Sequence, residues 1–127
     1  MIVLDANVLI GFLDANDAHH EACLQILEGH AVGGFAASVL TVAEELVHPT
    51  RVDRQDAALA ALRRIGLKIL PVALGDAAPL ARVHSQYGVR MPDAVALCAA
   101  LSSGSTRATL DDALIAAAER AGVPVAV

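Results

Sequence analysis

Four acidic residues lie where the sequence changes from one pattern to another, and each could ligate a metal ion. They are Asp5, Glu44, Asp93 and Asp111. Carboxylates gathered in one crevice raise one another's pKa and destabilise the fold unless a cation lies between them. Oxygen ligands without nitrogen or sulfur suit Mg²⁺ or Mn²⁺, which also bind waters and substrate phosphate. These acids therefore indicate a site for a divalent metal ion, and such an ion can lower the pKa of a bound water to make a nucleophile.

Each acid also has an ordinary structural explanation, because helix N-termini favour acidic side chains. Aspartate is a preferred N-cap, so Asp5 taken alone is better explained as a cap. Segment 41–44 has the spacing of a capping box, segment 92–93 suits a first helical turn, and either residue of 111–112 would cap the last helix. Capping does not explain why four carboxylates would meet with no basic residue among them.

The elements that must position these acids can be read from apolar periodicity. Residues 1–4 form an apolar run too short for a helix, and apolar residues recur at helical spacing from Ala6 onward, which places Asp5 at a strand-to-helix turn. Similar alternation continues along the chain, and Pro49 is expected to end the third helix. The expected strands are 1–4, 35–37, 68–72, 107–110 and 123–127, and the expected helices are 6–13, 17–29, 38 or 41 to 47, 53–65, 75–86, 92–102 and 111–121.

Strands that alternate with helices, without tight hairpins, indicate a parallel sheet with helices on both sides. The predicted fold class is α/β, a single three-layer domain over residues 1–127 with a central, mainly parallel sheet flanked by helices. In such a sheet the crossover helices begin at the carboxyl edge. All four acids are therefore expected at this edge, where open α/β sheets form their ligand crevice. The one lysine, Lys68, begins a strand and so belongs to the opposite edge.

Composition limits the classes of function. The net charge of −5 over 127 residues argues against general binding of nucleic acid through a basic surface. The presence of only three aromatic residues argues against an extended base-stacking platform. Cys23 and Cys98 lack disulfide or zinc-site spacing. No apolar run approaches the roughly 20 residues of a membrane span. Because no secretory leader is visible either, we expect a cytoplasmic location and no membrane partner.

Four motifs in order resemble the PIN domain, and in particular the VapC-type toxins of bacterial toxin–antitoxin pairs. The motifs are LDANVLI at 4–10, SVLTVAE at 38–44, PDA at 92–94 and TLD at 109–111. The resemblance covers the whole chain and implies a PIN-like fold and a Mg²⁺-dependent endoribonuclease, with Mn²⁺ as a substitute metal. It implies that Asp5, Glu44, Asp93 and Asp111 are the catalytic and metal-binding quartet. It also implies an RNA substrate, a cognate antitoxin protein and a homodimer.

The resemblance gives secondary roles to further residues. Asn7 and Thr109 carry over as polar supports, and Asp112 carries over as an additional metal ligand. One departure from the family pattern is the doubled Glu44-Glu45, where an apolar residue usually follows the first acid. Motif spacing favours Glu44 and leaves Glu45 as a substitute.

Arginines could contact RNA phosphates once a metal has filled the acidic crevice. For most of them a solvated helix face or a helix ion pair is the simpler explanation. They are Arg51, Arg54, Arg63, Arg64, Arg82, Arg90 and Arg107.

Other classes of protein also gather acids around Mg²⁺ at a sheet edge. A receiver-type signalling domain would need a basic residue after a late strand, and this sequence has none there. A phosphatase that begins DxD after its first strand would need an acid at Asn7. A PIN-like module that has lost catalysis, and acts only by binding RNA or a protein partner, stays open as an alternative.

Overall fold

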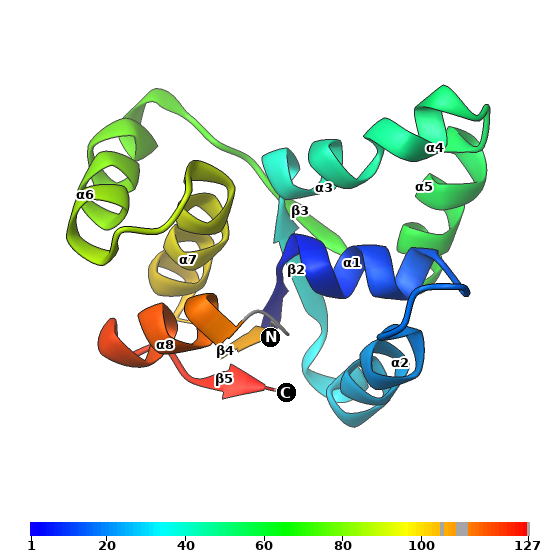
Figure 1. Ribbon diagram of the computed structural model, residues 1–127, viewed down its shortest axis with the longest axis horizontal. Coiled ribbons are helices and arrows are strands. Elements are labelled where there is room, and N and C mark those ends of the chain that lie inside the picture. The colour runs from blue at the N-terminus through cyan, green and yellow to red at the C-terminus, as the bar shows by residue number, and fades with distance from the viewer. Residues whose placement is uncertain (105, 109–111, 127) are drawn as a thin grey trace.

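The chain folds into a five-stranded sheet with helices packed around it (Figure 1). The computed structural model describes residues 1–104, 106–108 and 112–126. The strands are β1 (Ile2–Leu4), β2 (Phe35–Ser38), β3 (Lys68–Leu70), β4 (Thr106–Ala108) and β5 (Val125–Ala126). The helices are α1 (Ala6–Leu13), α2 (His20–Gly29), α3 (Val39–Glu45), α4 (Val47–Arg51), α5 (Gln55–Arg64), α6 (Ala77–Tyr87), α7 (Met91–Ser103) and α8 (Asp112–Arg120). Two short 3₁₀ turns, η1 (Ala31–Gly33) and η2 (Leu74–Asp76), precede β2 and α6.

The sheet is parallel, in the order β3-β2-β1-β4-β5. Central strand β1 pairs on both sides, with Ile2 opposite Phe35 of β2 and Thr106 of β4. From β1 the chain first builds outward through β2 and β3, and later returns to the other side of β1 for β4 and β5. The strand order therefore reverses at β1, which is where doubly wound sheets form ligand crevices. The predicted parallel sheet is confirmed.

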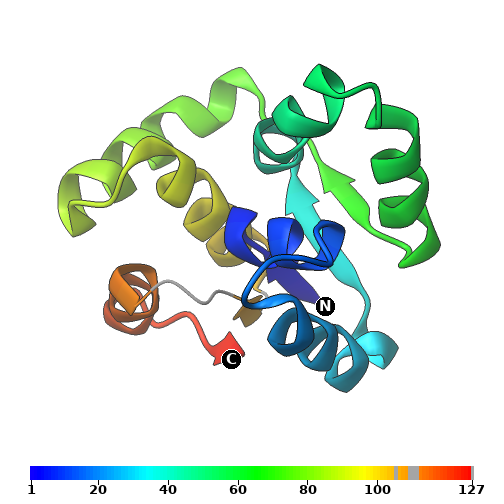
Figure 2. The same ribbon diagram turned by 45° about the vertical axis from the view of Figure 1, so that its right-hand side comes forward.

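Helices cover both faces of the sheet, so the predicted three layers are confirmed (Figure 2). Alternate residues of β1 point to opposite faces, as the twofold periodicity of a strand requires. Ile2 and Leu4 join the core beneath α1, α2 and α5, whereas Val3 joins the core beneath α6, α7 and α8. All three side chains are buried, which explains why β1 is continuously apolar rather than alternating.

The segment after β2 differs from the sequence expectation. Helix α3 is followed almost at once by α4, which contains Pro49 rather than ending before it. Pro49 lies in the first turn of α4, where backbone N–H groups have no intrahelical acceptor, so proline is tolerated there. The expected capping box is also wrong, because Ser38 caps α3 and its Oγ accepts a hydrogen bond from the Leu40 amide at 3.3 Å. Thr41 is instead buried in the helix.

Other boundaries differ by small amounts. Strand β3 ends at Leu70, two residues earlier than expected. The predicted strand 107–110 and helix 111–121 correspond to β4 and α8, but residues 109–111 between them lie outside the described part of the chain. None of the described helices is long and apolar enough to span a membrane.

Candidate metal-binding active site

Asp5 is held rigidly at the end of the central strand. It is the N-cap of α1, where its Oδ1 accepts a hydrogen bond from the Val8 amide at 3.1 Å. The residue is only 3% exposed. Burial of a charged group is costly unless hydrogen bonds compensate for it, and the Val8 amide supplies one such bond. The capping explanation is therefore confirmed. A carboxylate has two oxygens with about four lone-pair sites, so capping and metal ligation are compatible roles.

Helix α3 brings two glutamates to the same region. Glu44 is exposed and Glu45 is partly buried. Burial raises the pKa of Glu45 to about 7, with further contributions from the negative charges of Glu44 and Asp5. Because two charges affect each other's protonation only when they are close, Glu45 shares the electrostatic environment of Asp5. Motif spacing favours Glu44 and leaves Glu45 as a substitute.

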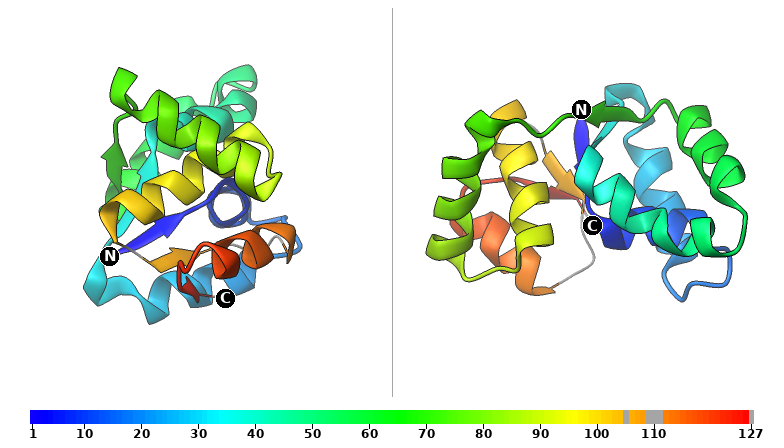
Figure 3. Two further views of the ribbon diagram at one scale, coloured as in Figure 1. Left: turned by 90° about the vertical axis from the view of Figure 1, so that its left-hand side faces the viewer. Right: turned by 90° about the horizontal axis from the view of Figure 1, so that it is seen from above.

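Asp93 lies in the first turn of α7, as predicted, with its side chain 24% exposed. Helices α3 and α7 pack against each other (Figure 3). Between them lies a hollow of about 420 Å³, which is lined by residues of both helices. These residues are Leu40, Thr41, Glu44, Met91, Pro92 and Val95. Glu44 therefore faces the N-terminus of the helix that carries Asp93.

Arg90 forms a helix ion pair of the kind that the sequence favours for most of its arginines, so one basic residue does lie beside an acid of the expected set. Arg90 is the N-cap of α7, and its Nε lies 3.7 Å from Asp93 Oδ2. The pair is spaced i,i+3, which places both side chains on one face of the helix. The local charge at this edge of the sheet is therefore less negative than the acids alone would give.

The structure describes only some of the remaining predicted site residues. Thr109 and Asp111 lie outside the described residues, and Asp112 is known only as the first residue of α8. Asn7 is exposed in the first turn of α1. Within the described residues, no three histidine, cysteine or acidic side chains are grouped closely enough to hold a metal ion. The structure thus brings Glu45 close enough to Glu44 and Asp5 to feel their charges, and it places Asp93 on the helix that packs against α3.

The donor chemistry nevertheless fits a hard divalent cation. The side chains concerned are carboxylates, the ligands that Mg²⁺ and Mn²⁺ prefer. Burial, and after it the repulsion by Glu44 and Asp5, raises the pKa of Glu45, and a nearby cation would favour the ionised form and offset that repulsion.

The comparison with protein families decides what kind of domain this is. The family model of the PIN domain matches residues 2–120. The chain belongs to the PIN-domain family. The family implied by the four sequence motifs is thereby confirmed.

Solved structures similar to this PIN domain include several toxins. A toxin–antitoxin complex from Klebsiella pneumoniae is 21% identical, with a TM-score of 0.76 over 100% of this chain and 97% of that one. A sarcin-ricin loop cleaving VapC toxin from Mycobacterium tuberculosis is 16% identical, with a TM-score of 0.72 over 92% and 95% of the two chains. The FitAcB structure from Neisseria gonorrhoeae is 24% identical, with a TM-score of 0.73 over 98% and 96%. At these identities the likeness concerns the fold. The comparison with curated proteins gave no match.

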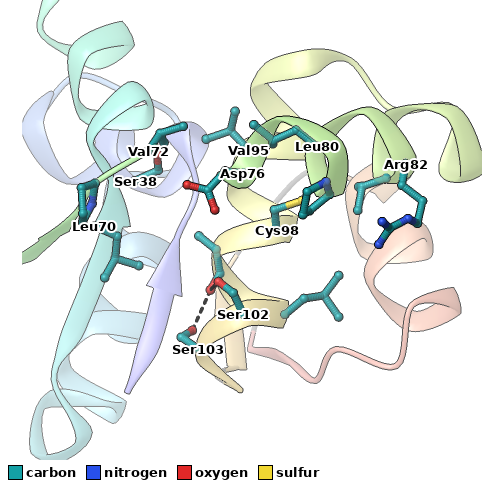
Figure 4. Close-up of a pocket in the computed structure, with 15 residues that line it drawn as sticks. Ser38, Leu70, Val72, Asp76, Leu80, Arg82, Val95, Cys98, Ser102 and Ser103 are labelled. Carbon is teal, nitrogen blue, oxygen red and sulfur yellow. Dashed lines mark hydrogen bonds between the residues drawn. The ribbon is translucent and has the colours of Figure 1, made fainter. Parts of the chain in front are cut away.

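This PIN domain has a second, larger cavity that contains none of the predicted acids. It measures about 490 Å³ and lies among the ends of β2 and β3, helix α6 and helix α7 (Figure 4). Much of its lining is apolar, including Leu70, Leu80 and Val95. The carboxylate that borders it, Asp76, is engaged locally, because its Oδ2 accepts a hydrogen bond from the Ala73 amide at 2.7 Å. The acid-bearing region between α1, α3 and α7 therefore stays the candidate active site.

Proposed function

We propose that this PIN domain is a Mg²⁺-dependent endoribonuclease that hydrolyses RNA phosphodiester bonds. The observation that carries the proposal is the placement of Asp5 at the strand-order switch, where its charge and that of Glu44 both act on Glu45. In this proposal Asp93 joins them from the first turn of α7, the helix that borders, with α3, the hollow that Glu44 lines. A crowded set of carboxylates is unfavourable by itself and becomes favourable when a divalent cation binds.

In this proposal the chain's own residues would bind the metal ion and hold its ligand oxygens in place. Asp5 is fixed by its capping bond, and Asp93 is fixed by the first turn of α7, so both present oxygen atoms from a stiff backbone. In this proposal Glu44, Asp111 and Asp112 complete the ligands, with Glu45 beside them. Asn7 and Thr109 would act as polar supports for the metal-binding carboxylates. Mg²⁺, or Mn²⁺ in its place, would lower the pKa of a water and neutralise charge on the phosphate.

We further infer that the protein is the toxin of a toxin–antitoxin pair. Several structures with the same fold are toxin–antitoxin complexes, including one from Klebsiella pneumoniae and one from Rickettsia felis. The expected assembly is a homodimer bound to a cognate antitoxin. Co-expression with the product of a short neighbouring gene, followed by co-purification, tests this assignment; a monomer that is harmless to its host would contradict it.

A cleavage assay with matched variants tests the nuclease directly. Purified protein should cut structured cellular RNA internally in the presence of Mg²⁺, and EDTA should stop the reaction. Asp5→Asn or Asp93→Asn should each slow cleavage by about 100-fold or more, because each change removes a carboxylate that would hold the metal ion, and the metal ion stabilises the negative charge of the transition state. Asp56→Asn is the control, since Asp56 is an exposed acid on α5 and the change in charge is the same.

Two other outcomes would have different meanings. Equal cleavage by the wild type and Asp5→Asn would show that the activity comes from a contaminant or from another site. RNA binding without cleavage, by the wild type and all variants alike, would favour a PIN-like module that acts only by binding.

A further inference from the structure

Arg90 occupies a position that does not favour helix stability. It is the N-cap of α7, where serine, threonine, aspartate and asparagine are preferred, and its side chain makes no capping hydrogen bond. The positive end of the helix dipole also lies there and disfavours a cation. An arginine at this position therefore requires an explanation other than capping.

The ion pair with Asp93 gives only a partial explanation. The Arg90 side chain is 80% exposed, and its Nε lies 3.7 Å from Asp93 Oδ2. The arginine side of the pair is open to water, and ion pairs that water screens in this way contribute little to stability. The guanidinium can therefore leave Asp93 at small cost, while its backbone stays anchored at the edge of the hollow between α3 and α7.

We propose that Arg90 is a substrate-binding residue that exchanges partners, pairing with Asp93 in the metal-free protein and with an RNA phosphate once a divalent cation has taken its place. This inference rests on the proposed function, because it requires a cation at Asp93 and an RNA substrate. Guanidinium suits the second role, since its planar fork of N–H donors matches the oxygens of a phosphate. The exchange also places a positive charge at the candidate active site, which helps a protein with a net charge of −5 to bind RNA, a polyanion.

The proposal predicts effects of opposite sign on two ligands. Arg90 competes with the cation for Asp93, so its removal should tighten metal binding. It also binds phosphate, so its removal should weaken RNA binding. A merely structural role for Arg90 would weaken both.

The metal half of the test uses Mn²⁺ alone, measured by titration calorimetry. Arg90→Gln should bind Mn²⁺ about two- to fivefold more tightly than the wild type, which is the scale of an exposed ion pair. Lys68→Gln is the matched control, because Lys68 is an exposed cation at the start of β3, on the opposite edge of the sheet. Thermal melting should show that both variants are as stable as the wild type, within the range of ordinary surface substitutions.

The RNA half uses a short fluorescein-labelled oligoribonucleotide that a gel shows to be uncut, with Mn²⁺ saturating and KCl varied. Loss of one phosphate contact should reduce the slope of log Kd against log salt by about 0.7 for single-stranded RNA. Arg90→Gln should show this reduction and Lys68→Gln should not. Arg90→Lys should restore most of the slope, because it keeps the charge.

The outcomes separate this inference from the proposed function. Tighter Mn²⁺ binding together with a reduced salt slope supports it. Identical behaviour of Arg90→Gln and Lys68→Gln overturns it and leaves the nuclease proposal intact. Weaker binding of both Mn²⁺ and RNA by Arg90→Gln has the same meaning. A wild-type protein that binds no Mn²⁺ would overturn both.

Discussion

At the scale of single residues, the two adjacent glutamates of α3 differ because a helix turns by about 100° per residue. Glu44 is exposed and lines the hollow that faces α7, whereas Glu45 is partly buried and senses the charge of Asp5. Sequence spacing treats them as alternatives for one role. The structure gives them different surroundings, and therefore different chemistry.

The raised pKa of Glu45 predicts how the stability of the metal-free protein depends on pH. The folded-state value is about 7 against an ordinary value of 4.5, so the folded state binds the proton more tightly than the unfolded state. This stabilisation is complete below pH 4.5 and is lost as the pH rises through 7. After allowance for solvent screening, we expect the unfolding free energy of the wild type to fall by on the order of 1 kcal/mol between pH 4.5 and 7 because of Glu45. Glu45→Gln should not show this decrease. Urea denaturation in EDTA at several pH values measures it.

Glu28→Gln is the control for this prediction, because Glu28 is an exposed glutamate on α2. It should leave the pH profile of the wild type unchanged. A profile for Glu45→Gln that parallels the wild type would show that Glu45 titrates normally in the folded protein.

At the scale of elements, the loop before α7 is fastened from two sides. The ring of His84 in α6 contacts the Val89 carbonyl through Nδ1 at 2.5 Å, and the carbonyl can only accept, so Nδ1–H is the donor. Arg120 of α8 donates from Nη2 to the Tyr87 carbonyl at 3.2 Å, and its guanidinium lies over the Tyr87 ring. These contacts fix the start of α7, and with it the position of Asp93.

The contact between α1 and α2 depends on a glycine. A Cβ atom at Gly11 would lie 2.3 Å from the Sγ of buried Cys23. The Gly11 carbonyl is also 2.6 Å from Nδ1 of His20 at the start of α2. This close approach allows α2 to pack against α1, the helix that Asp5 caps.

Gly11→Ala should therefore destabilise the protein, although alanine is the better helix former by about 1 kcal/mol. Overpacking of a core costs about 1–3 kcal/mol, so we expect a net loss of roughly 1 kcal/mol and a decrease in Tm of roughly 3–5 °C. Gly29→Ala is the control, because it lies in α2 with no atom within 4 Å of the added Cβ. Thermal melting checks both, and equal Tm values for the two variants would exclude the proposed clash.

At the scale of the whole molecule, the sequence was sufficient to predict the parallel α/β sheet, its three layers and the position of Asp5 at the end of β1. Periodicity identifies the elements, and the direction of the chain in a parallel sheet determines which helix ends meet at the carboxyl edge. The placement of Asp93 in the first turn of α7 followed from the same argument.

Other features could not be predicted because they depend on packing and on side-chain conformation. The nearness of Glu45 to Asp5 depends on which face of α3 turns toward α1. The approach of Arg90 to Asp93 depends on the rotamer of an exposed side chain. Helix α4 was missed because Pro49 suggests an end, whereas its place in a first turn permits a start.

The central claim is that acids at the switch point of the sheet hold a divalent cation, and it can be tested without knowing the RNA target. The most direct measurement is calorimetric titration of Mn²⁺ into the wild type, Asp5→Asn and Asp56→Asn. We predict equal affinities for the wild type and Asp56→Asn, and at least about tenfold weaker binding by Asp5→Asn. Equal affinity in all three proteins, or no Mn²⁺ binding by the wild type, would contradict the claim.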